Sequence, residues 1–186
     1  VYAMLPEGFE TRMRKLLGQE YDAFLSAFDR PLCTGLRKNP LKTGFAGNLS
    51  RFALSPVPWC PTGFYYGAAA RPGLSPLHAA GLYYLQEPSA MAPAELLAPQ
   101  PGDRVLDLCA APGGKSTQLA GKLCGRGILV CNEINSKRAK ILASNIERLG
   151  IANALVLNEH PQRLEARFGG FFDKILVDLS LIHISE

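Results

Sequence analysis

The residues best suited to chemistry lie in one short run, Asp-Leu-Cys-Ala-Ala-Pro-Gly-Gly-Lys-Ser, from Asp107 to Ser116. An apolar strand, expected over 104–108, leads into this carboxylate and into small residues that let a ligand approach the backbone. A helix is expected from about residue 114, and a helix N-terminus offers unpaired N–H groups and a positive dipole end. The run therefore predicts a site for a nucleotide-like cofactor at the first strand-to-helix turn of a doubly wound sheet.

Two other interpretations of this turn stay open. Residues 114–116 (Gly-Lys-Ser) match the end of a phosphate-binding P-loop, but Cys109 stands where that motif needs its first glycine. The turn can also be a tight strand–helix connection without a ligand. Glu133 favours the cofactor, because it closes the strand expected over 127–132, where an acid hydrogen-bonds the ribose of an adenosine-containing ligand.

The elements that position these residues alternate between strands and helices. Apolar runs predict strands at 104–108, 127–132, 153–158 and 174–177, and helices at 114–123 and 136–149. Ser136 is the expected N-cap of the second helix, and Gly150 is expected to end it. Strands separated by helices predict a parallel α/β sheet built from right-handed βαβ units.

The residues before this alternation have a different pattern. Apolar positions over 5–28 follow helical spacing and predict two helices that separate at Gly18. Residues 36–42 favour an extended segment, and aromatic residues between prolines and glycines predict short strands over 52–66. The expected organisation is a small α+β N-terminal domain over 1–75, a linker at 71–76 and a second domain over 76–178.

Charge is distributed unevenly along the chain. Residues 1–75 contain nine Lys/Arg and five Asp/Glu, whereas residues 76–186 contain eleven of each, so the net charge of +4 lies in the first segment. This excess favours contact of the N-terminal domain with a polyanion such as RNA. The longest uncharged run is interrupted by prolines, and five scattered cysteines form no metal-ligand pattern. We therefore expect a cytoplasmic monomer with no membrane span and no metal.

Several parts of the chain resemble the Sun/Nop family of RNA (cytosine-5)-methyltransferases. The run from Asp107 to Ser116 is similar to the cofactor motif of that family. The similarity extends to 84–90 (Tyr-Leu-Gln-Glu-Pro-Ser-Ala), 5–9 (Leu-Pro-Glu-Gly-Phe) and 35–39 (Gly-Leu-Arg-Lys-Asn). The combination most resembles the bacterial RsmF-type members, which modify small-subunit ribosomal RNA.

The resemblance implies an incomplete Rossmann-like class I methyltransferase domain with S-adenosylmethionine as methyl donor. In this fold class the expected strand order of the parallel sheet begins 3-2-1-4. The cofactor turn would line the donor's methionine end, Glu133 would bind its ribose, and Asp178 would lie beside donor and target base. The implied donor-site residues are Cys109, Ala110, Ala111, Pro112, Gly113, Gly114, Lys115, Glu133 and Asp178. Where family members have an Asp near the adenine, this chain has Pro161, and Glu159 is a weaker substitute.

The chemistry of the family needs a cysteine thiolate, which attacks C6 of cytosine so that C5 can take the methyl group. In the family this cysteine follows the Asp equivalent to Asp178, within Asp-Ala-Pro-Cys-Ser-Gly, and a second cysteine lies further on. This chain reads Leu-Ser-Leu-Ile-His-Ile-Ser-Glu over 179–186 instead. Its own cysteines are all expected to be packing residues, and they are Cys33, Cys60, Cys109, Cys124 and Cys131.

We therefore expect no catalytic residue in the chain as written, and no methyl transfer by it. Residues 1–3 and 179–186 are expected to be foreign to a parent protein whose methyltransferase domain is cut after the fourth strand. The resemblance implies that the parent methylates cytosine C5 in 16S ribosomal RNA. Two alternatives stay open, a transfer-RNA cytosine-5 methyltransferase of the same family and a non-catalytic module that binds RNA or the donor.

Overall fold

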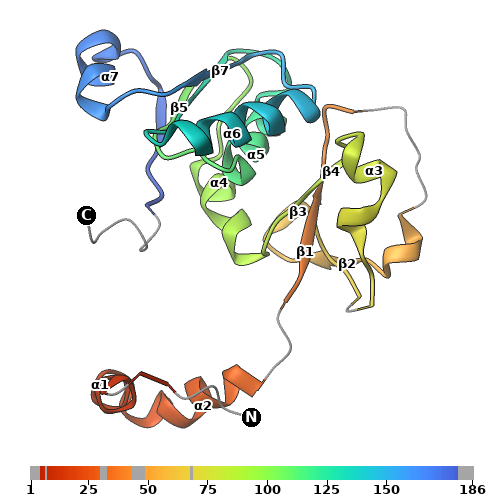
Figure 1. The fold of residues 1–186 in the computed structure, drawn as a ribbon, viewed down its shortest axis with the longest axis vertical. Coiled ribbons are helices and arrows are strands. Elements are labelled where there is room, and N and C mark those ends of the chain that lie inside the picture. Colours follow the sequence, from red (N-terminus) through yellow and green to blue (C-terminus); the bar gives the residue numbers. More distant parts are fainter. Residues whose placement is uncertain (1–4, 7, 30–32, 43–48, 68, 180–186) are drawn as a thin grey trace. The chain divides into compact units, whose positions relative to one another are not determined.

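The computed structural model of the protein describes residues 5–6, 8–29, 33–42, 49–67 and 69–179. The chain divides into two compact units, residues 1–33 and 34–186. Figure 1 shows both units as a ribbon, with most of their helices and strands labelled. None of the helices in the described ranges is long and apolar enough to cross a membrane.

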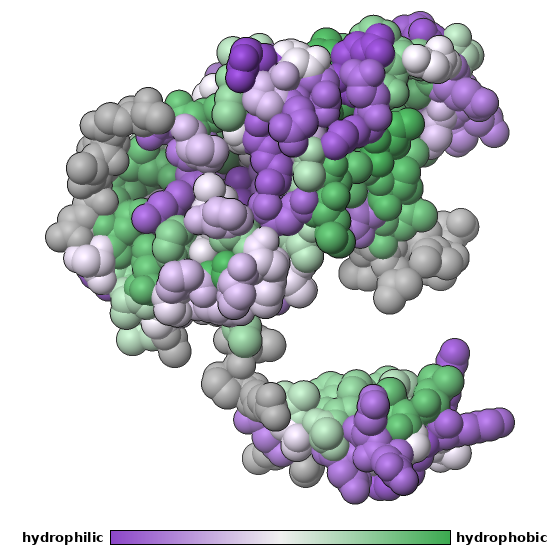
Figure 2. Space-filling view, turned by 180° about the vertical axis from the view of Figure 1, so that it is seen from behind, coloured by the Kyte–Doolittle hydropathy of each residue, from purple (hydrophilic) through white to green (hydrophobic). Residues whose placement is uncertain are grey.

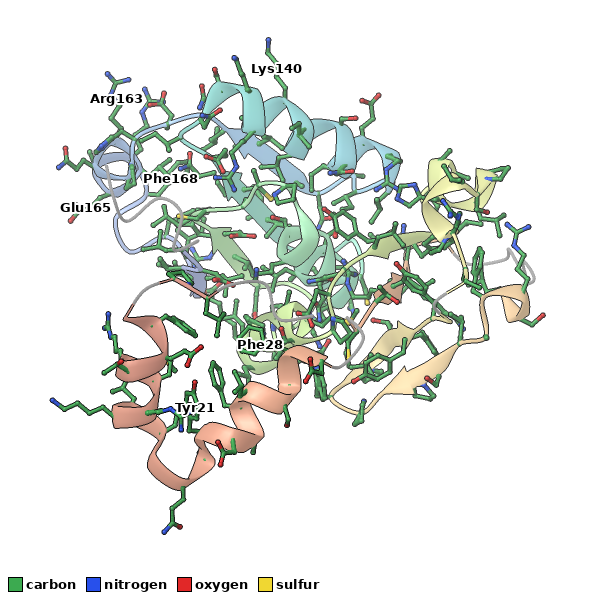
Figure 3. All side chains as sticks on the ribbon, turned by 60° about the horizontal axis from the view of Figure 1, so that its bottom comes forward. Tyr21, Phe28, Lys140, Arg163, Glu165 and Phe168 are labelled. Atoms are coloured by element: carbon green, nitrogen blue, oxygen red, sulfur yellow. The ribbon has the colours of Figure 1, made fainter. Side chains whose placement is uncertain are left out.

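The first unit is a pair of short helices, which confirms the prediction from apolar spacing. α1 spans Phe9–Leu17 and α2 spans Tyr21–Ser26, and a 3₁₀ turn follows each of them. Gly18 separates the two with a φ of +52°, a backbone conformation that favours glycine. Tyr21 is only 2% exposed and lies between the helices (Figure 3), where the guanidinium of Arg14 stacks 4.0 Å from its ring centroid.

The second unit begins with an antiparallel sheet in the strand order β2-β3-β1-β4 (Figure 1). Its strands are β1 Gly35–Lys38, β2 Ser55–Val57, β3 Cys60–Tyr65 and β4 Tyr83–Leu85. Leu36, Phe52 and Tyr83 are buried against this sheet, and the rings of Phe52 and Tyr83 meet edge to face at 5.9 Å. The predicted extended segment and short strands are confirmed.

Residues 71–76 do not form the predicted linker. Pro72–Leu74 make a 3₁₀ turn, and α3 spans Pro76–Ala79 with the Ser75 hydroxyl as its N-cap. The hydroxyl of Tyr83 donates a hydrogen bond to the carbonyl of Pro72 at 2.7 Å, which ties the segment to β4. The prolines that suggested a linker begin these short helices instead. The expected boundary between residues 75 and 76 therefore falls between strands of one sheet.

The rest of the second unit is the predicted parallel sheet. Its elements are α4 Ala92–Leu97, β5 Arg104–Asp107, α5 Gly114–Leu123, β6 Ile128–Asn132, α6 Ser136–Arg148, β7 Ala154–Leu157, α7 Pro161–Phe168 and β8 Lys174–Leu176. All three strand pairs are parallel, and the order β7-β6-β5-β8 confirms the predicted 3-2-1-4 arrangement. The fold is the expected Rossmann-like one, and α7 is an element that the sequence patterns did not reveal.

α6 is capped one residue earlier than predicted. The side-chain oxygen of Asn135 accepts hydrogen bonds from the backbone N–H groups of Lys137 at 3.0 Å and Arg138 at 3.2 Å. Asn135 is therefore the N-cap, and Ser136 is the first residue of the helix. Gly150 follows the helix with a φ of +73°, as its predicted role in ending the helix requires.

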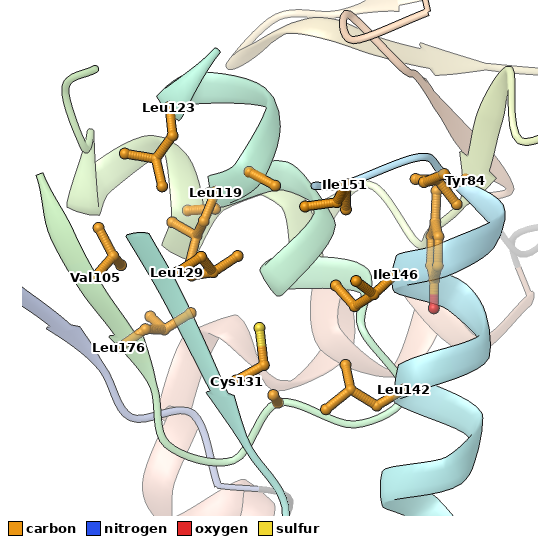
Figure 4. Close-up of a cluster of buried hydrophobic side chains, with 14 of the residues drawn as sticks. Tyr84, Val105, Leu119, Leu123, Leu129, Cys131, Leu142, Ile146, Ile151 and Leu176 are labelled. Atoms are coloured by element: carbon orange, nitrogen blue, oxygen red, sulfur yellow. The ribbon is translucent and has the colours of Figure 1, made fainter. Parts of the chain in front are cut away.

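A hydrophobic core packs helices α5 and α6 against the parallel sheet (Figure 4). Side chains from the sheet and from both helices are buried together in it, among them Val105, Leu119, Leu123, Leu129, Cys131, Leu142, Ile146 and Leu176. Ala94 of α4 is buried in the same core. Because helices hold the sheet from this side, the carboxyl ends of its strands have fixed positions. Those ends carry the residues of the candidate site.

The opposite face of the parallel sheet is exposed at its two edges. Successive side chains of a strand point to opposite faces, and Leu155 of β7 and Ile175 of β8 are 44% and 51% exposed beside neighbours that are more buried. Val177, just beyond β8, is 54% exposed. Broad hydrophobic areas are visible on the molecular surface in Figure 2. Sheets of this type normally have helices on both faces, so this face is the less protected one.

Candidate cofactor-binding site

The turn between β5 and α5 requires glycine at one of its two glycine positions. Gly113 is the N-cap of α5 and has a φ of +111°, which side chains rarely adopt. A Cβ atom on Gly113 would also lie 3.2 Å from the Cδ1 atom of Leu142 in α6. At Gly114 a Cβ atom would make only ordinary contacts, at 3.4 Å and beyond. Gly113 therefore sets how closely the turn approaches α6.

A cavity of about 690 Å³ lies where β5, β6 and β8 end, and its volume suits a small organic ligand. Open α/β sheets bind their ligands at this end. All the predicted donor-site residues except Gly113 line the cavity, namely Cys109, Ala110, Ala111, Pro112, Gly114, Lys115, Glu133 and Asp178. The fold thus brings together residues that are up to 69 positions apart in the sequence.

Other walls of the cavity come from residues that were not predicted as site residues. Tyr84 and Gln86 reach it from β4 and the segment after it, and Ile134 and Arg138 reach it from the β6–α6 connection and α6. Pro161, at the start of α7, closes part of the side where the family's Asp was expected. The resemblance over 84–90 was the available signal for the first pair, whereas no local pattern marked Arg138.

Beneath the turn, Asp107 is almost completely buried, at 1% exposure. The hydroxyl of Ser116 donates a 2.6 Å hydrogen bond to its Oδ2 atom, which links the end of β5 to the first turn of α5. Burial raises the pKa of Asp107 to about 6, although the bond from Ser116 and the charge of Lys115 partly offset that effect. The charged form of this carboxylate is therefore disfavoured by its surroundings, close to the cavity.

Lys115 and Asp178 form an ion pair across the cavity wall. The Nζ atom of Lys115 lies 2.8 Å from the Oδ2 atom of Asp178, and both side chains are about one-third exposed. The pair joins the start of α5 to the end of β8. It places one cation and one anion, both still accessible, at the side of the cavity nearest to β8.

Glu133 is held in place by its neighbours at the end of β6. Its Oε1 atom accepts a 2.9 Å hydrogen bond from the backbone N–H of Asn135, and its Oε2 atom lies 3.6 Å from a guanidinium nitrogen of Arg138. The residue as a whole is 3% exposed. Each carboxylate oxygen can accept more than one hydrogen bond, so Glu133 retains acceptor capacity toward the cavity.

Three side chains, two from α6 and one from β1, hold the carbonyl groups of the turn. A guanidinium nitrogen of Arg138 donates to the carbonyl of Ala111 at 2.8 Å, and the amide of Asn145 donates to that of Pro112 at 2.8 Å. The carbonyl of Gly114 accepts a 3.0 Å hydrogen bond from Arg37 of β1. The conformation of the turn is therefore fixed from α6 and from the antiparallel sheet.

Glu159 does not take the place of the missing acid near the adenine. Its carboxylate pairs with Arg163 of α7 at 3.3 Å, and it is not among the residues that line the cavity. His160 immediately precedes α7 as its N-cap residue and makes no side-chain capping bond. Asn158 donates hydrogen bonds to the carbonyls of Glu133 and Ile134 and so supports the opposite side of the site.

The cysteines at or near the site are not activated as nucleophiles. Cys109 lines the cavity, but burial and the nearby charges of Asp107 and Glu133 raise the pKa of its thiol. Burial likewise raises the pKa of Cys131 inside β6 and of Cys60 in β3. A raised pKa keeps a thiol protonated at neutral pH. Within the described ranges, no group of three or more His, Cys, Asp or Glu is arranged to hold a metal ion.

Comparisons with curated proteins identify closely related sequences. The chain is 38% identical over 190 aligned residues to a ribosomal RNA small subunit methyltransferase F of Escherichia coli O1:K1 / APEC. It is also 38% identical to the protein of the same name from Salmonella newport. In each case the match covers 93% of this chain and 39% of the relative. The chain thus spans about two fifths of the length of the curated relatives that it matches.

Solved structures show the same fold. A methyltransferase homologue from Pyrococcus horikoshii superimposes with a TM-score of 0.80 at 30% identity, over 94% of this chain and 59% of that one. The structure of NSun6 from the same organism has a TM-score of 0.79 at 19% identity, over 94% and 70% of the two chains, and this likeness concerns the fold alone.

Two family models match consecutive parts of the chain. Residues 5–88 match the N-terminal domain of 16S rRNA methyltransferase RsmF, and residues 94–180 match the 16S rRNA methyltransferase RsmB/F model. Between them they take in both sheets and almost every residue that lines the cavity. With these matches and the close relatives above, the chain belongs to the RsmB/F family of 16S rRNA methyltransferases.

Proposed function

We propose that the protein to which these residues belong transfers a methyl group from S-adenosylmethionine to C5 of a cytosine in 16S ribosomal RNA. In this proposal, residues 34–179 supply the donor site. The observation that carries it is the cavity at the carboxyl ends of β5, β6 and β8, which gathers eight of the nine predicted donor-site residues. The names of the relatives, which are ribosomal RNA methyltransferases, favour ribosomal RNA over the transfer-RNA alternative.

The residues around the cavity fit the donor's chemistry. When bound, S-adenosylmethionine supplies an electrophilic methyl group on its sulfonium sulfur. The N-terminus of α5 at Gly114 suits the carboxylate of the methionine end, because it presents unpaired N–H groups and a positive dipole end. Glu133, whose carboxylate is fixed by the backbone N–H of Asn135, would accept hydrogen bonds from the ribose hydroxyls. Lys115 and Asp178 remain accessible on the side where a target base would enter.

A thiolate for the attack on cytosine C6 is not provided by the cysteines near the cavity. The thiol of Cys109 is kept protonated by burial and by neighbouring carboxylates, and Cys131 is enclosed in β6. The 186 residues are therefore proposed to bind the donor and to transfer no methyl group. The target base would have to leave its stack to reach such a cavity.

The N-terminal residues are proposed to contact the RNA. The net positive charge of the chain falls in residues 1–75, and α1 carries Arg12, Arg14 and Lys15 along nine residues. Lys and Arg side chains neutralise phosphates and supply most of the sequence-independent affinity for RNA. A ribosomal RNA substrate would place the protein in the cytoplasm.

Calorimetric titration with S-adenosylmethionine tests the donor site. The unaltered chain is expected to bind the donor, and Glu133→Ala is expected to weaken binding by about tenfold because the ribose hydroxyls lose a charged acceptor. Glu159→Ala is the matched control, since it removes a carboxylate that lies outside the cavity. A chain that folds, as judged by circular dichroism, and yet binds no donor would refute the proposal.

A further inference from the structure

Arg37 lies in the middle of β1 and is completely surrounded, with 1% of its surface exposed. Its Nε atom donates a 3.0 Å hydrogen bond to the side-chain oxygen of Gln86. Its Nη2 atom donates to the carbonyl of Gly114 at 3.0 Å and to the hydroxyl of Thr117 at 2.6 Å. All three acceptors are neutral, and no ion pair involving Arg37 occurs in the part of the chain that the structure describes.

The carboxylate of Glu95 acts on Arg37 only at a distance, with no hydrogen bond or ion pair between them among the described residues. Holding two sheets together with a buried guanidinium that has no hydrogen-bonded carboxylate costs more free energy than a neutral contact would. Burial lowers the pKa of Arg37 to about 10, so the side chain remains charged at neutral pH while its solvation is lost. A neutral side chain of similar volume could fill the same space at lower cost. The charge is therefore expected to serve something other than packing.

The acceptors of Arg37 point to that purpose. Gly114 is the first residue of α5 and Thr117 is the fourth, so both belong to its first turn, and Gly114 also lines the cavity. Gln86, the third partner, lines the cavity from the other side. Arg37 thus fixes the turn from behind and brings a full positive charge to the helix end whose dipole is already positive.

We propose that Arg37 is a positioning residue for the methionine end of the donor, and that it acts through Gly114 and Thr117 without touching the ligand. This inference rests on the proposed function, because it assumes that the N-terminus of α5 receives the donor's carboxylate. It assigns a role in donor binding to β1, a strand of the part of the chain that matches the RsmF N-terminal domain.

Two ligands separate this role from a merely structural one. S-adenosylhomocysteine carries the amino-acid end, whereas 5′-methylthioadenosine has the same adenosine and lacks that end. In calorimetric titrations of the full chain, Arg37→Gln is expected to bind S-adenosylhomocysteine about tenfold more weakly and methylthioadenosine within about twofold of the unaltered chain. Arg37→Lys keeps the charge without the fork of donors and is expected to recover part of the loss.

Asn39→Ala is the matched control in the same strand segment. The amide of Asn39 is buried and donates to the carbonyls of Gly81 and Leu149, both at 2.9 Å, with no bond to the cofactor turn. This variant is expected to lower the melting temperature and to leave the ratio of the two affinities unchanged. Thr117→Val removes one acceptor of Arg37 together with the hydrogen bond from that hydroxyl to the carbonyl of Gly114, and it is expected to change that ratio in the direction of Arg37→Gln.

The affinity ratios of these variants decide whether Arg37 has a positioning role. Equal weakening of both ligands by Arg37→Gln, or an unchanged ratio in Thr117→Val, would overturn the positioning role. If Arg37→Gln does not fold, the Thr117→Val ratio alone decides. Failure of the unaltered chain to bind either ligand would instead refute the proposed donor site, so the two ideas can fail separately.

Discussion

Asp107 allows the electrostatics of the site to be tested through stability. Its pKa is raised from 3.8 to about 6 in the folded chain, mainly by burial. The folded state therefore holds the proton more tightly than the unfolded state. Stability contributed by this group is greatest below about pH 4, falls as the pH rises toward about 6, and is constant above that value. Asp107→Asn removes this titration and keeps an acceptor for the hydroxyl of Ser116.

The expected change in stability follows from the size of the pKa shift of Asp107. A difference of about two pKa units corresponds to about 3 kcal/mol between the protonation states, since each unit is worth about 1.4 kcal/mol. At neutral pH the free energy of unfolding of the unaltered chain is lowered by nearly all of this amount, whereas at about pH 4 it is lowered by less than 1 kcal/mol. The stability of Asp107→Asn relative to the unaltered chain is therefore expected to rise by about 2 kcal/mol between these conditions.

Urea denaturation followed by circular dichroism, repeated from acid to neutral pH, measures this difference. Asp173→Asn is the control of opposite sign. Hydrogen bonds from Arg104 lower the pKa of Asp173 to about 2, so its stabilisation is present above its ordinary pKa and disappears as the pH falls toward 2. A stability difference for Asp107→Asn that stays flat or shrinks as the pH rises would refute the account of Asp107 as a carboxylate destabilised by burial.

Three further predictions follow from the turn, the helix cap and the cysteines. Gly113→Ala is expected to destabilise the chain more than Gly102→Ala in thermal unfolding, because both glycines have a φ near +110° but only the first would press a Cβ atom against Leu142. Asn135→Ala is expected to cost about 1 kcal/mol in urea denaturation and Ser136→Ala only a few tenths, and equal losses would contradict the assignment of the cap. The chain as written is expected to transfer no labelled methyl group to 16S ribosomal RNA in a filter-binding assay, and any turnover above background would show that a thiol or another route has been overlooked.

The sequence allowed the parallel sheet and its turn to be predicted because their signals are local. Apolar runs between helices mark β5 to β7, and the strand order is the one expected of the fold class that the resemblance implied. The glycines and the carboxylate of the turn lie within ten residues of one another, so they could be recognised as one site. Glu133 was also accessible to this reasoning, since it directly follows the next strand.

What could not be predicted depends on contacts between distant residues or on competition between neighbours. Asn135 and Ser136 are both good helix caps, and only the backbone geometry decides which side chain reaches the free N–H groups. The segment 71–76 has the proline and glycine content of a linker, but its ordering depends on a hydrogen bond from Tyr83 of β4. The hydrogen bond from Arg37 to the carbonyl of Gly114 joins residues 77 positions apart, so no local sequence pattern indicates it.

The same long-range contacts argue that the two sheets of residues 34–186 form one structural unit. Besides Arg37, the amide of Asn39 bonds across to the end of α6 at Leu149, and a Cβ atom on Gly121 of α5 would lie 2.9 Å from Pro40. The walls of the cavity come from both sheets, because Gln86 follows β4 while Glu133 follows β6. The boundary between the two family models therefore separates two sequence patterns, whereas the cavity proposed to bind the donor is lined by residues from both.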